Sequence, residues 1–324
     1  MIKDTLRAEE KQEALEKSWE IKELCLRYLT PLLSKLDQVM DARLVNTLFD
    51  LVLVIVIHRD RHQGLLLSEL GGELLGEQHA PAGAKRISNV LHSKRWQAQQ
   101  IEAELWQQAD QRIEQLECSN DEALVIWDES EVEKPESLAA EGLCPVRSSK
   151  ARRLKRIKPG FYNPPAGRPI FVPGYHWLQL VVVGMKGAAR LAHLHWWTSR
   201  GPRASDKRME AFLVLRRVAQ MWGRRELHVF DQGYAGAPWL GWLLLFQLRF
   251  VLRWKKDYTL VGPDNQTQSA RRLVAWKRSL DQRRIWDAPR RCWRNVGIYF
   301  LPVRHPAFPQ FQLWLVVSRP GPGR

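Results

Sequence analysis

Cysteine is scarce in this sequence, and long hydrophobic runs are missing. The four cysteines among 324 residues form no CxxC pair, so neither a zinc site nor a disulfide framework is indicated, and a reducing cytosol is expected. The most apolar stretch, residues 48–57 (LFDLVLVIVI), contains Asp50. A bilayer span needs roughly 20 apolar residues. The opening residues are mostly charged, unlike a secretory signal. We therefore expect a cytoplasmic protein without a membrane partner.

Acidic residues are scarce in one part of the chain. Residues 1–130 have a net charge of −8 and residues 131–324 one of +23, which together give +15. A lobe this basic attracts a polyanion, because cations near phosphates release condensed counterions. A nucleic acid is therefore the expected partner, with a merely solvated basic surface or a ribosome-like basic protein as the alternative. No P-loop, GxGxxG, GxSxG or kinase motif occurs, so ATP use and covalent hydrolase chemistry gain no support.

The hydrophobic pattern of residues 1–120 predicts a helical domain, and a basic helix within it makes it the candidate DNA-binding domain. Apolar residues recur at steps of three and four, with breaks expected at residues 30–31, 71–72 and 80–83. A helix is predicted over residues 85–96. Its basic face could enter a DNA groove in the manner of a helix-turn-helix, whereas a simple packed helix hairpin is the alternative. The candidate DNA contacts on this helix are Lys85, Arg86 and Arg95.

The pattern changes at residue 121, and residues 121–254 predict an α/β catalytic core. Strand and helix patterns alternate as strand, hairpin, helix, strand, helix and strand, which indicates a mixed sheet compatible with the RNase H arrangement. The predicted strands are residues 124–127, 177–185, 190–197, 226–230 and 250–254, and the predicted helices are residues 204–222 and 235–247. Residues 255–324 form a basic, β-rich insertion region, with strands at residues 296–303 and 312–317.

Two aspartates occupy equivalent positions in this pattern. Asp128 closes the apolar run LVIW, and Asp231 closes LHVF. If the two strands are neighbours, both carboxylates emerge at the same edge of the sheet, where open α/β sheets place their sites. Carboxylates in such a place can bind a pair of Mg²⁺ ions for phosphoryl transfer. The alternative is that each aspartate simply caps a turn.

The motifs around these aspartates resemble those of a known family. Asp128 begins DES, Asp231 begins DQGY, and residues 150–165 read KARRLKRIKPGFYNPP. Together they resemble the DDE transposases of the insertion-sequence-four group, which have an RNase H-like core. The resemblance implies that Asp128 and Asp231 are catalytic ligands for Mg²⁺ or Mn²⁺. It also implies cut-and-paste cleavage of transposon ends and joining to target DNA. Double-stranded DNA would then be the partner, with a homodimer on DNA and a nucleoid location.

The basic segments also have candidate roles. The loop at residues 150–158 would grip backbone phosphates, unless it is only a basic linker. Trp276, Trp286 and Trp293 are interleaved with cations and could stack on an unpaired base, with core packing as the alternative for each. The loop cations are Lys150, Arg152, Arg153, Lys155, Arg156 and Lys158.

The sequence departs from the family at the third carboxylate. The family carries a late Glu within Tyr-x₂-Arg-x₃-Glu-x₆-Lys, but no Glu follows Glu226 here. We therefore expect a C-terminally truncated chain that lacks the final catalytic helix and cannot cut or join DNA alone. The alternatives are a catalytically inactive DNA-binding remnant or inhibitor, and an RNase H-like nuclease that recruits Asp257 or Asp287.

Overall fold

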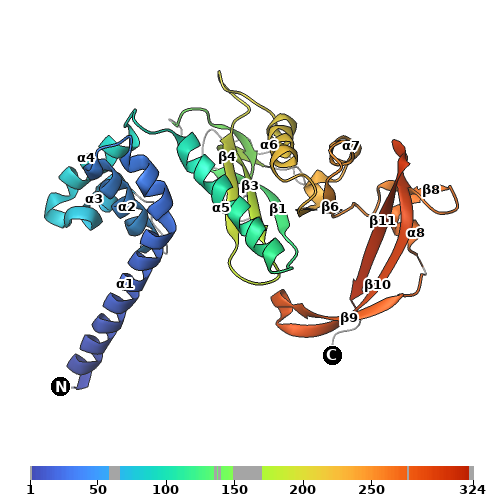
Figure 1. Ribbon diagram of the computed structural model, residues 1–324, viewed down its shortest axis with the longest axis horizontal. Coiled ribbons are helices and arrows are strands. Elements are labelled where there is room, and N and C mark those ends of the chain that lie inside the picture. The colour runs from blue at the N-terminus through green and yellow to red at the C-terminus, as the bar shows by residue number, and fades with distance from the viewer. Residues whose placement is uncertain are drawn as a thin grey trace. The chain divides into compact units, whose positions relative to one another are not determined.

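The chain forms two compact units, Met1–Gln107 and Gln108–Arg324. The computed structural model (Figure 1) describes residues 2–57, 66–134, 137, 140–148, 170–275 and 277–320. The division at residues 120 and 254 that the sequence suggests stays a prediction. No helix among the described residues is long and apolar enough to cross a membrane.

The first unit is helical, in agreement with the pattern of residues 1–120. One core joins α1 to α2 and α4 through Leu36, Val45 and Val90, and a second joins α2 to α3 and α4 through Leu51, Leu70 and Ile87. The helices are α1 (Ile2–Asp37), α2 (Ala42–Ile57), α3 (Leu67–Leu75) and α4 (Ala80–Leu91), followed by α5 (Ala98–Cys118), which continues into the second unit.

The predicted breaks in this unit are misplaced: the interruption between α3 and α4 falls between Leu75 and Ala80. Pro31 lies inside α1, and the Gly71–Gly72 pair lies inside α3. Gly83 lies inside α4, which therefore begins before residue 85 and ends at Leu91. A Cβ on Gly83 would come within 2.2 Å of the Gly71 carbonyl oxygen. These glycines let α3 and α4 pack backbone against backbone, which favours the helix-hairpin alternative for this segment.

The main sheet of the second unit contains both parallel and antiparallel strand pairs. β1 pairs with β3 in antiparallel and with β5 in parallel, β5 pairs with β6 in parallel, and β4 pairs with the far side of β3 in antiparallel. The mixed sheet predicted from the sequence is thus confirmed. The strands are β1 (Leu124–Glu133), β2 (Cys144–Arg147), β3 (Phe171–Val183), β4 (Arg190–Trp197), β5 (Leu227–Phe230) and β6 (Arg249–Leu252).

β1 is longer than the sequence indicates. It continues through Asp128 to Glu133, because β3 pairs with all of it, from Leu124 opposite Val183 to Glu133 opposite Gly174. The parallel ladder with β5 is shorter and ends where Trp127 pairs with Phe230. Asp128 therefore marks the end of the parallel ladder and does not close the strand.

Helices α6 (Lys207–Met221) and α7 (Ala237–Leu245) follow the pattern closely. The Asp206 carboxylate caps α6 by accepting hydrogen bonds from the Arg208 and Met209 amides. On one face of the sheet Trp127 and Phe230 are almost fully buried, and Trp239 of α7 lies 5.7 Å from Trp127 between ring centroids. The opposite face is more open, since Ile126 is 37% exposed.

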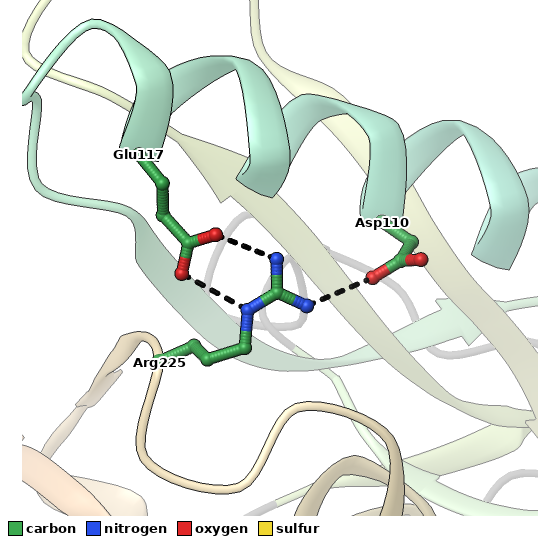
Figure 2. A network of polar contacts seen from close by, with 3 residues as sticks. All are labelled: Asp110, Glu117 and Arg225. Atoms are coloured by element: carbon green, nitrogen blue, oxygen red, sulfur yellow. Dashed lines mark hydrogen bonds and ion pairs between the residues drawn. The ribbon is translucent and has the colours of Figure 1, made fainter.

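The Arg225 side chain ties the loop before β5 to α5. Its guanidinium donates to both carboxylate oxygens of Glu117, at 2.9 and 2.6 Å, and forms an ion pair with Asp110 at 3.4 Å (Figure 2). The hydrogen bonds from Arg225 lower the pKa of Glu117 below its ordinary value of 4.5. This bidentate contact fixes α5 to the loop that precedes β5.

We expect Arg225→Ala to lower the free energy of unfolding by about 1 kcal/mol at neutral pH, because the paired groups are partly exposed. Since the folded pKa of Glu117 is lowered, its contribution is present above pH 4.5 and is lost as the pH falls through the folded value. Urea unfolding at pH 7 and pH 3 measures the difference. The neighbouring exposed Arg224→Ala variant is the control, and an equal loss at both pH values would contradict the expectation.

The C-terminal sheet has the order β11-β10-β7-β8, and β9 pairs with the free part of β10. Its core contains Leu260, Leu273, Leu301 and Val303. The predicted strands 296–303 and 312–317 are confirmed as parts of longer strands, whereas β7, β8 and β9 were not predicted. The elements are β7 (Thr259–Val261), β8 (Thr267–Ser269), α8 (Ala270–Leu273), β9 (Asp281–Asp287), β10 (Cys292–His305) and β11 (Phe308–Pro320).

Candidate functional site

Asp128 and Asp231 come together at the end of the parallel ladder. Each directly follows one member of the last pair of β1 and β5, Trp127 and Phe230. Because side chains alternate along a strand, Asp128 shares the open face of the sheet with Ile126. Both aspartates line a groove of about 1560 Å³ on this face. The structure thus brings the two predicted carboxylates to one edge, as the sequence pattern indicated.

Both carboxylates are oriented by a hydrogen bond. The Gln179 amide donates from Nε2 to Asp128 Oδ2 at 2.8 Å, and the Gly233 backbone amide donates to Asp231 Oδ1 at 2.8 Å. A Cβ on Gly233 would lie 2.9 Å from that same oxygen, so a larger residue there would displace the Asp231 carboxylate. Gln179 was not predicted from the sequence, because only the register identifies it, opposite Asp128 on β3.

This arrangement fits part of a divalent-metal site. Each aspartate keeps lone pairs that its one hydrogen bond does not use, and Mg²⁺ accepts one or two carboxylates together with water and phosphate oxygens. Among the described residues, however, no group of three or more His, Cys, Asp or Glu side chains is arranged to hold a metal ion. Asp128 and Asp231 can therefore contribute two carboxylates, and the metal role itself stays a prediction.

The two later aspartates considered as a third ligand differ in their surroundings. Asp287 pairs with Arg294 at 3.1 Å and with Arg290 at 3.7 Å, so its carboxylate is engaged within the β9–β10 ribbon. Asp257 is exposed and lines a small cleft of about 360 Å³ together with Gln232, the residue after Asp231. Of the two, Asp257 is the one that shares a cleft with the DQGY turn.

The predicted DNA-contacting cations fall into two groups. The loop residues Lys150, Arg152, Arg153, Lys155, Arg156 and Lys158 lie outside the described residues. In the first unit Lys85 and Arg95 are exposed, whereas Arg86 is half-buried and donates from Nε to Thr47 Oγ1 at 2.8 Å. Arg86 therefore helps to hold α4 against α2, and Lys85 and Arg95 remain open to a polyanion.

The tryptophans of the basic stretch are not core residues where the structure describes them. Trp286 and Trp293 face each other across β9 and β10, 5.7 Å apart between ring centroids, and they are 48% and 55% exposed. The Arg284 guanidinium lies 5.5 Å from the centre of the Trp293 ring. Core packing is therefore the wrong interpretation for these two side chains, and stacking on a base stays a prediction. Trp276 lies outside the described residues.

Comparisons with known proteins add little to this geometry. No protein-family model matches the sequence, and no curated protein matches it either. Six chains of solved structures match. One of them is the piggyBac transposase in a synaptic complex with hairpin DNA, with a TM-score of 0.36 and 11% sequence identity over 91% of this chain. The chain spans 60% of that transposase chain. At this level the likeness carries no argument about function.

Proposed function

We propose that this chain is part of a DNA transposase of the DDE kind, which cuts transposon ends and joins them to target DNA by two-metal phosphoryl transfer. The observation that carries the proposal is that Asp128 and Asp231 each directly follow the last residue pair of the parallel β1–β5 ladder and line the same groove. The strand order of the main sheet and the net charge of +23 in residues 131–324 support it. A homodimer on DNA and a nucleoid location follow only from the resemblance to the family.

The residues of this chain would hold and orient the metal. Asp128 and Asp231 would each give carboxylate oxygens to Mg²⁺ or Mn²⁺. Gln179 and the Gly233 amide would fix the direction of those oxygens through their hydrogen bonds. A bound metal pair supplies activation of the attacking oxygen and stabilisation of the leaving oxygen. Exposed cations such as Lys85 and Arg95 would bind DNA phosphates and set the position of the duplex.

A third carboxylate of the kind that the family resemblance implies would have room in the groove beside the aspartates. Apolar side chains in its lining are well exposed, with Ile126 at 37%, Val251 at 53% and Trp314 at 58%. A further segment with one apolar face would bury them and could bring a carboxylate next to Asp128 and Asp231. We propose this groove as the seat of the glutamate-bearing helix that the family resemblance implies.

Metal titration tests the role of the aspartates. We expect Mn²⁺ to bind the wild-type chain weakly and both Asp128→Asn and Asp231→Asn to reduce its affinity by at least about 10-fold, because each removes one of two charged ligands. Isothermal calorimetry or Mn²⁺ electron resonance measures the affinity. Asp264→Asn, an exposed aspartate in a turn after β7, serves as the control. Equal affinity in all four proteins would contradict the metal role.

A second candidate function is DNA binding without cleavage, as in a remnant or inhibitor. It is favoured by the lack of any three-ligand group among the described residues. For this candidate we expect duplex binding whose affinity falls steeply with salt, because phosphate contacts release counterions, and no Mg²⁺-dependent nicking. A filter-binding series from about 50 to 200 mM salt and a plasmid nicking assay measure both. Robust nicking abolished by Asp128→Ala would contradict it, and nicking abolished by Asp257→Asn would favour the nuclease alternative.

A further inference from the structure

A charged pair lies directly behind the two aspartates, on the opposite face of the sheet. Glu129 follows Asp128 in β1, so its side chain points to the face that carries Trp127. There it forms a close ion pair with Lys207, the first residue of α6. The Glu129 side chain is only 17% exposed, whereas that of Lys207 is 51% exposed. One residue of β1 thus faces the groove, and the next one is anchored to a helix.

The Glu129–Lys207 pair also contacts the turn that carries Asp231, through Tyr234. Tyr234 ends the short 3-10 turn that Asp231 caps, and it is 5% exposed. Its ring packs 5.2 Å from Phe230 and 4.9 Å from Trp239, and the Lys207 ammonium lies 5.5 Å from the ring centre. Burial and the neighbouring Glu129 carboxylate raise the pKa of Tyr234, so its hydroxyl keeps its proton. Lys207 therefore touches both the strand of Asp128 and the turn of Asp231.

Among the described residues, no backbone hydrogen bond joins β1 to the turn of Asp231. The parallel ladder of β1 and β5 ends at Trp127 and Phe230, one residue before each aspartate. Beyond that point β1 pairs only with β3. Side chains bridge β1 and the turn instead: the Trp127 ring lies 6.4 Å from the Tyr234 ring between centroids, and Lys207 contacts both Glu129 and Tyr234.

We propose that Lys207 and Glu129 are positioning residues, whose ion pair against the Tyr234 ring fixes the turn of Asp231 relative to the strand of Asp128. The expected effect on metal affinity rests on the proposed metal function, whereas the contact between Lys207, Glu129 and the turn is a property of the fold. A two-metal site holds its ions about 3.5–4 Å apart, so a small displacement of one carboxylate weakens shared coordination. Neither residue needs to touch metal or DNA to have this effect.

Hydrogen exchange of the full chain tests the link without any metal. In Lys207→Met and Glu129→Gln we expect amide exchange across the turn Gln232–Tyr234 to rise by at least about 10-fold, because the anchor of the turn is lost. Lys207→Arg keeps the cation and should restore most of the protection. Glu122→Gln is the matched control, since it breaks the Glu122–Arg249 ion pair at the opposite end of the strands.

The Mn²⁺ affinity of the same variants tests the consequence. We expect Lys207→Met and Glu129→Gln to weaken binding by about 10-fold and Glu122→Gln to leave it unchanged. Turn protection that is unchanged in both variants would overturn the positioning role, as would faster exchange with wild-type metal affinity. If the wild-type chain binds no Mn²⁺ at Asp128, the proposed function fails, whereas the exchange result still decides whether Lys207 holds the turn.

Discussion

Gly71→Ala is expected to destabilise the helical unit by about 3 kcal/mol, at the upper end of the usual cost of overpacking. A Cβ at this position would lie 2.4 Å from the Ala84 amide nitrogen and 2.5 Å from the Ala80 carbonyl oxygen. These are backbone atoms of α4, so no side-chain rotation can relieve the overlap, and α3 and α4 would have to separate. Their separation would loosen the core formed by Leu51, Leu70 and Ile87. Urea unfolding followed by circular dichroism measures the loss.

Gly72→Ala is the matched control in the same helix. Its Cβ would meet the Ala80 Cβ at 3.5 Å, an ordinary van der Waals contact. Because alanine is the better helix former, we expect the free energy of unfolding of this variant to rise by about 0.5–1 kcal/mol. If Gly71→Ala were as stable as Gly72→Ala, the close approach of α3 and α4 would be wrong.

His228→Leu is expected to lower the stability of the second unit by about 2–6 kcal/mol, because Glu226 and the Trp127 indole each lose a buried polar partner at about 1–3 kcal/mol apiece. His228 and Glu226 both have fully buried side chains, and His228 Nε2 lies 3.2 Å from Glu226 Oε1. The Trp127 indole donates from Nε1 to His228 Nδ1 at 3.1 Å, which leaves the Nε2 proton directed to Glu226. Without the imidazole, Glu226 is a fully buried side chain that has lost its polar neighbour.

The double variant Glu226→Leu, His228→Leu separates the cost of the buried charge from that of packing. We expect it to recover the part of the loss that comes from Glu226, because no buried carboxyl group is left without its partner, while Trp127 still loses its acceptor at a cost of about 1–3 kcal/mol. A thermodynamic cycle over the two single variants and the double one gives the coupling free energy. A double variant no more stable than His228→Leu would show that the unpaired carboxylate is not the source of the loss.

The core of the second unit was well predicted from the sequence, because its strong patterns are local. The apolar runs before Asp128 and Asp231, the turn before β4 and the amphipathic α6 each lie within one short segment. The length of β1 could not be predicted in this way. Residues 129–133 carry mostly charged side chains, and they form a strand because β3 pairs with them from about forty positions or more away along the chain.

The glycines of the first unit were misleading for a different reason. Glycine weakens an isolated helix, so Gly71, Gly72 and Gly83 predict breaks when each segment is considered alone. In the fold they lie where two helices meet, and the close packing of α3 against α4 outweighs the weak local preference. Gln179 was missed in a similar way, because its position opposite Asp128 depends on the register of β1 and β3. Local sequence specifies neither the helix packing nor the strand register.

A crystal of the chain soaked with Mn²⁺ tests the central claim most directly, since anomalous scattering locates the ion without reference to activity. The account predicts a peak within coordination distance of both Asp128 and Asp231, at roughly 2.0–2.4 Å from their carboxylate oxygens, and its loss in Asp231→Asn. A peak found elsewhere, with none at these aspartates at saturating Mn²⁺, would contradict the proposal that they form a metal-binding pair.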